Sequence, residues 1–214
     1  MSDRGLIMVV SAPSGTGKTT ICRQVLRDFP DLAFSVSYTT RKPRPGEVDG
    51  RDYYFVSEEE FRERIEKGEF VEWVVNYGNY YGTSFKDLEE KLNQGKDVMC
   101  DVEFRGARAI KERYEEGVFI YILPPDLTEL KNRLGRRGFE SPEVIERRFS
   151  QALDEIKSIF WYDYVIFNDK LERAVENLKA IYMAEKCRRS RLERKISEFL
   201  CKVSGGDKNG QNND

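Results

Sequence analysis

The residues best suited to chemistry lie in the segment SAPSGTGKTT, residues 11–20. They follow the phosphate-binding pattern G-x-x-x-x-G-K-[ST], except that Ala12 occupies the position of the first glycine. The two later glycines permit positive φ and close approach of the backbone to phosphate oxygens. Lys18 can reach β- and γ-phosphates, and Thr19 offers a hydroxyl to Mg²⁺. The residues expected to hold the phosphates are Ala12, Pro13, Ser14, Gly15, Thr16, Gly17, Lys18, Thr19 and Thr20.

A strand and a helix must flank such a loop. GLIMVVS (5–11) is a continuous apolar run, typical of a buried parallel strand. KTTICRQVLRDF (18–29) places three apolar residues on one side at helical spacing. The helix N-terminus then directs several backbone N–H groups at one point. An ordinary turn rich in small residues is the alternative, but this context favours a loop that binds a nucleoside triphosphate.

Three further apolar runs extend the pattern of alternating strands and helices. DVMCDVE (97–103), VFIYIL (118–123) and YVIFN (164–168) are candidates for buried strands. Strands that alternate with helices predict an α/β fold with a central parallel sheet and right-handed crossovers. We therefore expect a three-layer P-loop sandwich. Its core is assigned to residues 1–36, 96–133 and 150–203.

Two segments interrupt this pattern and are expected to form insertions. Residues 37–95 contain short aromatic-rich strands around a helix beginning at Ser57, with Glu60 as its capping-box partner. They predict a separate small subdomain. Residues 134–149 are dense in arginine and predict a mobile lid. Residues 204–214 lack apolar side chains and are expected to be a disordered tail.

Composition limits the classes of partner and of chemistry. Charged residues make up 35% of the 214 residues and the net charge is −2, so neither nucleic acid nor an anionic membrane is an expected partner. The apolar run at residues 6–10 is too short for a signal peptide or a membrane span, which predicts a cytoplasmic protein. Four widely spaced cysteines indicate neither a disulfide framework nor a zinc site. Histidine is absent, which removes the commonest general base.

One longer stretch resembles a known family. FSVSYTTRKPRPGEVDGRDYYFVS (34–57) resembles the monophosphate-binding segment of guanylate kinases, and NYYGTS (79–84) strengthens the match. With the P-loop, the arginine-rich insertion and IFND (166–169), the resemblance extends from about residue 5 to residue 185. It implies an enzyme that transfers the γ-phosphate of ATP to GMP, and to dGMP, with Mg²⁺ as cofactor. The acceptor phosphate is already a dianion near neutral pH, because its second pKa is about 6, so no histidine base is needed.

The resemblance assigns the phosphate of GMP to two arginines and two tyrosines. Guanidinium groups match phosphate oxygens, and phenol hydroxyls add neutral donors. Taken singly, the arginines could belong to a solvated basic loop and the tyrosines could simply pack. The four residues are Arg41, Arg44, Tyr53 and Tyr81.

The resemblance assigns guanine to a carboxylate. Guanine presents N1–H and N2–H₂ as adjacent donors, which one carboxylate can accept and which adenine lacks. Glu72 matches the carboxylate that binds guanine in the family, and Ser37 and Thr83 match its hydroxyl partners. Periodicity alone favours the alternative that Glu72 lies on the solvated face of a strand, with Val71 and Trp73 inward.

The segment DVEFRGA departs from the family pattern. Glu103 stands where the family has aspartate, and Arg105 where it usually has glutamine, so the contact between Glu103 and guanine is the least secure of the GMP assignments. Asp101 ends the apolar strand, at a position where a carboxylate can approach Mg²⁺ together with Thr19. A strand-end cap is the alternative for Asp101.

Arginines of the lid complete the expected machinery. Charge spreads over the equatorial oxygens during transfer, and mobile arginines stabilise it while excluding water. The roles of Arg136 and Arg147 are not separable from those of their neighbours. The residues expected to act in catalysis are Lys18, Arg41, Arg133, Arg137 and Arg148.

The sequence allows two interpretations for each of two features near the C-terminus. Asn168 corresponds to the family residue near the adenine of ATP, although a turn-forming asparagine at a strand end is equally typical. A helical stretch over about 169–200 could pack on the core or meet a second chain, so a monomer and a homodimer are both compatible. Its basic cluster is most simply a solvated face; the cluster comprises Arg188, Arg189, Arg191 and Arg194.

Two other functions are compatible with this resemblance. A non-catalytic interaction module would be expected to have a broken P-loop, whereas Lys18 and Thr19 are present. Glu72 argues against a P-loop kinase with a different acceptor. Glu103 and Arg105 depart from the family pattern and are compatible with that alternative.

Overall fold

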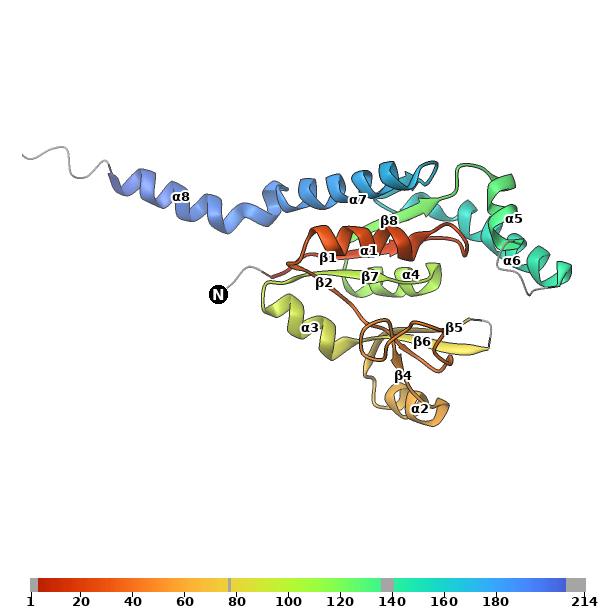
Figure 1. Cartoon of the computed structure of the whole chain (residues 1–214). Helices are drawn as coiled ribbons and strands as arrows, with labels where there is room; N and C mark the ends of the chain where they lie inside the picture. Colours follow the sequence, from red (N-terminus) through yellow and green to blue (C-terminus); the bar gives the residue numbers. More distant parts are fainter. Residues whose placement is uncertain (1–3, 77, 136–140, 207–214) are drawn as a thin grey trace, which may run out of the picture.

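The computed structural model describes residues 4–76, 78–135 and 141–206. Its centre is a five-stranded sheet in the order β2-β7-β1-β8-β9, in which all paired strands run parallel (Figure 1). The predicted parallel α/β sheet is therefore confirmed, with one short edge strand, β2, added to the four expected. The strands are β1 (Ile7–Ser11), β2 (Leu32–Phe34), β7 (Asp97–Asp101), β8 (Val118–Leu123) and β9 (Tyr164–Phe167).

Helices cover both faces of this sheet, because alternate side chains of its strands fill two separate cores. Met8 and Val10 of β1 pack in one core with helices α1 (Lys18–Asp28) and α7 (Leu171–Lys186). Ile7 and Val9 pack in the other core, with helices α3 (Phe85–Asn93) and α4 (Phe104–Arg113). Figure 1 shows these helix pairs on opposite sides of the strands. The loop after β1 is thus held between two packed layers.

Residues 38–84 form a second, four-stranded sheet in the order β4-β3-β6-β5. Helix α2 (Glu58–Glu66) begins after Ser57, whose hydroxyl accepts a hydrogen bond from the backbone N–H of Glu60 at 3.1 Å, as the sequence predicts. The carboxylate of Glu60 pairs with Arg64. This sheet lies beyond α4 in Figure 1, below the central sheet. Its strands are β3 (Tyr38–Thr39), β4 (Tyr54–Phe55), β5 (Phe70–Asn76) and β6 (Asn79–Ser84).

Two helices pack together at the far end of the central sheet. They are α5 (Leu127–Gly135) and α6 (Pro142–Lys157), with a small core of Leu130, Leu134 and Ala152. Ser141 is the N-cap of α6 and Pro142 occupies its first turn, where proline is favoured because its missing N–H is not needed. A short 3₁₀ helix, η1 (Ile159–Trp161), leads into β9.

The C-terminal region differs from the expected continuous helical stretch. Helix α7 ends at Lys186, and η2 (Arg189–Leu192) precedes α8 (Glu193–Gly206), which extends away from the body of the chain (Figure 1). Glu185, in the last turn of α7, is buried, and its carboxylate accepts hydrogen bonds from Tyr164 and Arg188. Helix α8 includes residues 204–206, which the sequence assigned to the tail.

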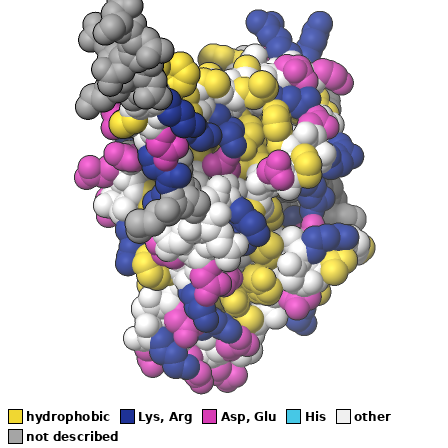
Figure 2. Space-filling view, turned by 90° about the vertical axis from the view of Figure 1, so that its left-hand side faces the viewer, with side chains coloured by type: hydrophobic (Ala, Val, Ile, Leu, Met, Phe, Trp, Pro, Cys, Tyr) yellow, Lys and Arg dark blue, Asp and Glu magenta, His cyan; other side chains and the backbone are white. Residues whose placement is uncertain are grey.

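The basic cluster is only partly the solvated face expected from sequence. The side chain of Arg191 is 23% exposed and donates to the carbonyl of Glu116, whereas Arg189 remains exposed. Figure 2 shows basic and acidic side chains interspersed on one face, in keeping with the nearly balanced charge. No helix within the described residues is long and apolar enough to cross a bilayer.

Candidate active site

The loop after β1 has the backbone geometry that its sequence predicts. Gly15 and Gly17 have φ of 92° and 90°, in the left-handed region that favours glycine, and α1 begins at Lys18. Ala12 is 1% exposed and packs in the core shared with α1. Its methyl group therefore lies in the core, so alanine at this position is compatible with an intact loop.

The loop lysine lies against the end of β7. Nζ of Lys18 is 2.7 Å from Oδ1 of Asp101 and donates to the carbonyl of Val102 at 2.6 Å. Burial alone would lower the pKa of Lys18, but the carboxylates of Asp101 and Glu103 outweigh it, and the pKa is raised. Lys18 thus keeps its positive charge while buried.

The hydroxyl of Thr19 also meets this strand end. Its Oγ1 donates to Oδ2 of Asp101 at 3.1 Å, so one carboxylate contacts both loop side chains. Hydroxyl and carboxylate oxygens are ligands that Mg²⁺ prefers, and this pair fits a partial coordination shell completed by substrate phosphates and water. Among the described residues no group of three or more acidic, cysteine or histidine side chains is arranged around one point.

Asn168 and Arg133 approach the loop from its other side. The amide of Asn168, at the end of β9, donates to the carbonyl of Thr16 at 2.6 Å. A guanidinium N–H of Arg133 donates to the same carbonyl at 3.3 Å, while its Nε donates to Glu129. Asn168 is buried, and a Cβ on Gly17 would lie 3.0 Å from its amide nitrogen. The asparagine therefore supports the loop backbone, a contact that the sequence alone did not indicate.

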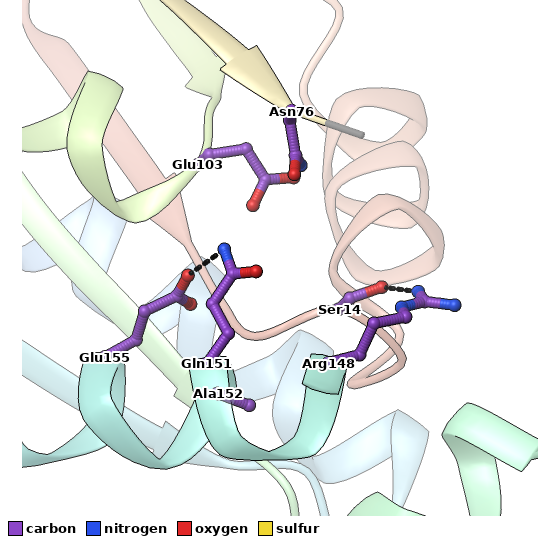
Figure 3. A pocket seen from close by; sticks show the side chains of 7 residues that line it. All are labelled: Ser14, Asn76, Glu103, Arg148, Gln151, Ala152 and Glu155. Atoms are coloured by element: carbon purple, nitrogen blue, oxygen red, sulfur yellow. Dashed lines mark hydrogen bonds between the residues drawn. The ribbon is translucent and has the colours of Figure 1, made fainter. Parts of the chain in front are cut away.

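Arg148 of α6 also reaches the loop. Its guanidinium donates to the hydroxyl of Ser14 and its side chain is buried (Figure 3). Arg147, its neighbour, is exposed, as expected for a helix surface. Arg136 and Arg137 lie outside the described residues. Of the arginines expected to act in transfer, the structure brings Arg133 and Arg148 to the phosphate-binding loop.

A small pocket separates α6 from the ends of β5 and β7. Figure 3 shows Glu103, Asn76 and Gln151 pointing toward one another, with Glu155 bound to Gln151. Burial and the nearby charge of Glu103 raise the pKa of Glu155 to about 7. Gln151 and Glu155 of α6 were not expected in a site from the sequence. They follow Arg148 by three and seven residues, which places all three side chains on one face of the helix.

The carboxylate of Glu72 is buried beside β6. Glu72 is 6% exposed, and its Oε1 accepts a hydrogen bond of 2.6 Å from the hydroxyl of Thr83. Burial raises the pKa of Glu72 to about 7, although the bond from Thr83 acts in the opposite direction. The alternative of a solvated Glu72 is wrong: Trp73 is 46% exposed instead. Strand β5 therefore buries the face opposite to the one that periodicity suggested. Phe70 packs on Phe61 of α2, and the β5–β6 register shifts between Phe70 and Glu72.

The arginines of the monophosphate segment are organised by Glu47. One guanidinium nitrogen of Arg41 lies 2.9 and 3.0 Å from the two carboxylate oxygens of Glu47, which also accepts from the backbone N–H of Arg44 at 2.7 Å. The same guanidinium lies 5.3 Å from the ring centre of Tyr53. Glu47 was not assigned a role from sequence, although its spacing of three from Arg44 in the motif is a signal that could have indicated one.

The two tyrosines lie next to each other. The ring centres of Tyr53 and Tyr81 are 6.0 Å apart. Burial and the charge of Asp101 raise the pKa of Tyr53 to about 12, so its phenol stays a neutral donor.

The remaining expected residues border the same region. Ser37 precedes β3, and its backbone carbonyl accepts from Tyr54. Glu103 is the N-cap residue of α4 and its charge raises the pKa of both Lys18 and Glu72. Arg105 is exposed on α4. The carboxylate of Glu103 lines the small pocket together with Ser14 of the loop and Asn76 of β5.

A P-loop on a parallel sheet, facing a second site with arginines and a buried carboxylate, defines a kinase of the nucleoside monophosphate class. The sequence model of guanylate kinase matches residues 4–185. The chain belongs to the guanylate kinase family.

Individual relatives agree with this assignment. A guanylate kinase of Geobacter metallireducens is 51% identical over 198 residues, which cover 92% of this chain and 98% of the relative. A guanylate kinase of Syntrophus aciditrophicus is 54% identical over 197 residues, covering 92% and 95%. The crystal structure of guanylate kinase from Anaplasma phagocytophilum superposes with a TM-score of 0.77 at 32% identity, over 92% of this chain and 95% of that one.

Proposed function

We propose that this chain transfers the γ-phosphate of ATP to GMP, and to dGMP, giving ADP and GDP. The observation that carries this proposal is the buried carboxylate of Glu72, hydrogen-bonded to Thr83, in the inserted subdomain. A buried carboxylate needs donors, and guanine offers two adjacent ones. AMP lacks both, and a site built on such groups rejects an analogue without them by roughly 10⁴-fold.

The donor side of the site holds the triphosphate. The loop of residues 12–20 binds the phosphates through those of its residues that carry a backbone N–H and through the N-terminus of α1, and Lys18 stabilises charge on the β- and γ-phosphoryl groups. Arg133 and Arg148, which already contact the loop, neutralise charge that develops on the transferred group. Arg137 is proposed for the same role, and Asn168 for the edge of the site nearest adenine.

Thr19 and Asp101 would hold Mg²⁺ together with the phosphates of ATP. The ion would neutralise negative charge on the phosphoryl groups during transfer. Asp101 has a second role that its contact with Lys18 supports: it holds the lysine ammonium group at the carboxyl end of β7.

The acceptor side binds the monophosphate and brings it in line with the donor. Arg41, Arg44, Tyr53 and Tyr81 bind the phosphate of GMP, while Glu47 fixes the direction of Arg41. No residue has to remove a proton, because the attacking phosphate oxygen is already ionised near neutral pH. Catalysis therefore consists of alignment and charge neutralisation.

The base is held by Glu72, Ser37 and Thr83, with Glu103 at the side that faces the loop. We infer that residues 37–95 and the lid, 134–149, close over the two substrates and exclude water, which protects ATP from hydrolysis. Two properties remain predictions from the sequence. They are a location in the cytoplasm and a monomeric or homodimeric state.

A coupled assay of ADP release with GMP, dGMP, AMP, CMP and UMP as acceptors tests the proposal. We expect turnover with GMP and dGMP and at least about 10³-fold lower kcat/KM with the others. Preference for another acceptor would contradict the assignment of guanine. Absence of turnover with all five would instead indicate a non-catalytic binding module.

A further inference from the structure

Gly106 of helix α4 lies against the carboxylate of Glu72. A Cβ built on Gly106 would lie 2.6 Å from Oε2, 3.0 Å from Cδ and 3.5 Å from Oε1 of Glu72. Gly106 is itself buried, and α4 packs directly on strand β5, which carries Glu72. The carboxylate therefore occupies the space that any other side chain at position 106 would need.

Backbone conformation does not explain glycine at this position. Gly106 lies in the first turns of a helix, and its φ is outside the left-handed region in which Gly15 and Gly17 are found. Glycine is among the least favourable residues in a helix, whereas alanine is the most favourable. The close approach of Glu72 is the feature that requires glycine.

Gly106 and Thr83 together locate the two oxygens of the carboxylate. Thr83, on β6, donates to Oε1, and a Cβ on Gly106, on α4, would lie 2.6 Å from Oε2. The carboxylate is thus held between a hydrogen-bond donor and a steric boundary. A carboxylate fixed in this way can present both oxygens to a pair of adjacent donors in one orientation.

We propose that Gly106 is a positioning residue that sets guanine specificity by leaving room for the carboxylate of Glu72. The inference rests on the proposed role of Glu72 in binding guanine. Gly106 does not touch the substrate; it acts through Glu72. A methyl group at this position would move the carboxylate, because the end of a rotatable side chain yields more readily than the backbone of α4.

The test is Gly106→Ala, assayed for both substrates. A displacement on the order of 1 Å of a positioned group can cost up to about 100-fold, so we expect KM for GMP to rise roughly 10- to 100-fold. KM for ATP should stay within about twofold, because the contacts of the phosphate-binding loop are unaltered. The matched control is Arg108→Ala, an exposed residue of the same helix, which should change neither KM.

A double variant with Glu72→Asp identifies the contact itself. The shorter carboxylate leaves space for a methyl group, so Gly106→Ala should have little further effect on KM for GMP in that background. Additive effects would overturn the inference.

The remaining outcomes separate this inference from the proposed function. If Gly106→Ala leaves KM for GMP unchanged while Glu72→Gln raises it, Gly106 does not position Glu72 and the proposed function stands. If Gly106→Ala impairs GMP and ATP equally and lowers the melting temperature, its role is structural only, which also overturns the inference. If neither variant affects GMP, the proposed role of Glu72 is itself wrong.

Discussion

Lys18 and Asp101 form an ion pair of 2.7 Å between the phosphate-binding loop and the carboxyl end of β7. Both side chains are largely buried, and Asp101 also accepts from Thr19. A buried charge without its partner is costly, so the pair fixes the lysine in the loop and keeps it protonated. The same carboxylate therefore links the lysine and the proposed metal-binding hydroxyl in one unit.

Lys18→Ala should lower kcat by roughly 10²- to 10³-fold or more, because it removes a charge that stabilises the transferred phosphoryl group. Binding of GMP should change little, since the residues proposed to hold the monophosphate, Arg41 and Arg44, are unaltered. Steady-state kinetics and calorimetric titration with GMP measure the two effects separately. A variant that retains at least a tenth of the parent kcat would show that the loop lysine is not needed for transfer.

Affinity for GMP should depend on pH through Glu72. Its pKa of about 7 means that the carboxylate is largely protonated at pH 6 and ionised at pH 8. Only the ionised form accepts from both guanine donors, so KM for GMP should rise roughly tenfold from pH 8 to pH 6. The phosphate of GMP also titrates in this range. Glu72→Gln is the control, because the pH dependence that remains in this variant is the contribution of the phosphate. Identical pH profiles for parent and variant would contradict the assignment.

Glu72→Gln should also stabilise the fold in a pH-dependent way. Because the folded pKa of Glu72 lies above its unfolded value of 4.5, the folded state binds more protons between these values. Its burial therefore lowers stability as pH rises from about 4.5 through 7. The variant escapes this cost and should be more stable than the parent by about 1–3 kcal/mol at pH 8. At pH 5 the gain should be small.

Urea denaturation of parent and variant at the two pH values measures this difference. Glu155 titrates in the same range, but it is present in both proteins and cancels in the comparison. A variant less stable than the parent at pH 8 would show that the carboxylate is stabilised by contacts and does not carry a burial cost.

Glu47→Ala should weaken GMP binding by releasing Arg41. The two oxygens of Glu47 hold one guanidinium nitrogen, and loss of that orientation should raise KM for GMP roughly tenfold, equivalent to about 1.4 kcal/mol. KM for ATP should be unaffected. In an Arg41→Ala background, Glu47→Ala should add little, because Glu47 acts through the arginine. Fully additive effects would mean that Glu47 contributes by another route.

Features encoded in adjacent residues were predictable from the sequence. The strand, loop and helix around Lys18 and the cap at Ser57 depend on neighbours within a few positions, and the structure confirms them. The face on which Glu72 lies was not predictable from periodicity, because the phase of β5 is set by packing of Phe70 on α2 and by a register shift. Alternation alone defines two faces but does not say which is buried.

Contacts between distant parts of the chain could also not be predicted from the sequence. Arg148 and Ser14 are 134 positions apart, and Asn168 and Thr16 are 152 apart, so only the packing of α6 and β9 brings them together. The need for glycine at position 106 could not be predicted from the sequence, because it arises only where α4 packs against β5.

The most direct test of a site that recognises the paired donors of guanine is calorimetric titration of the purified chain at pH 8 with GMP and with AMP. We expect heat from GMP and none from AMP at the same concentrations. Glu72→Gln should lose the GMP signal while keeping that of ATP with Mg²⁺. Equal binding of GMP and AMP, or unchanged GMP binding by the variant, would contradict recognition of guanine by Glu72.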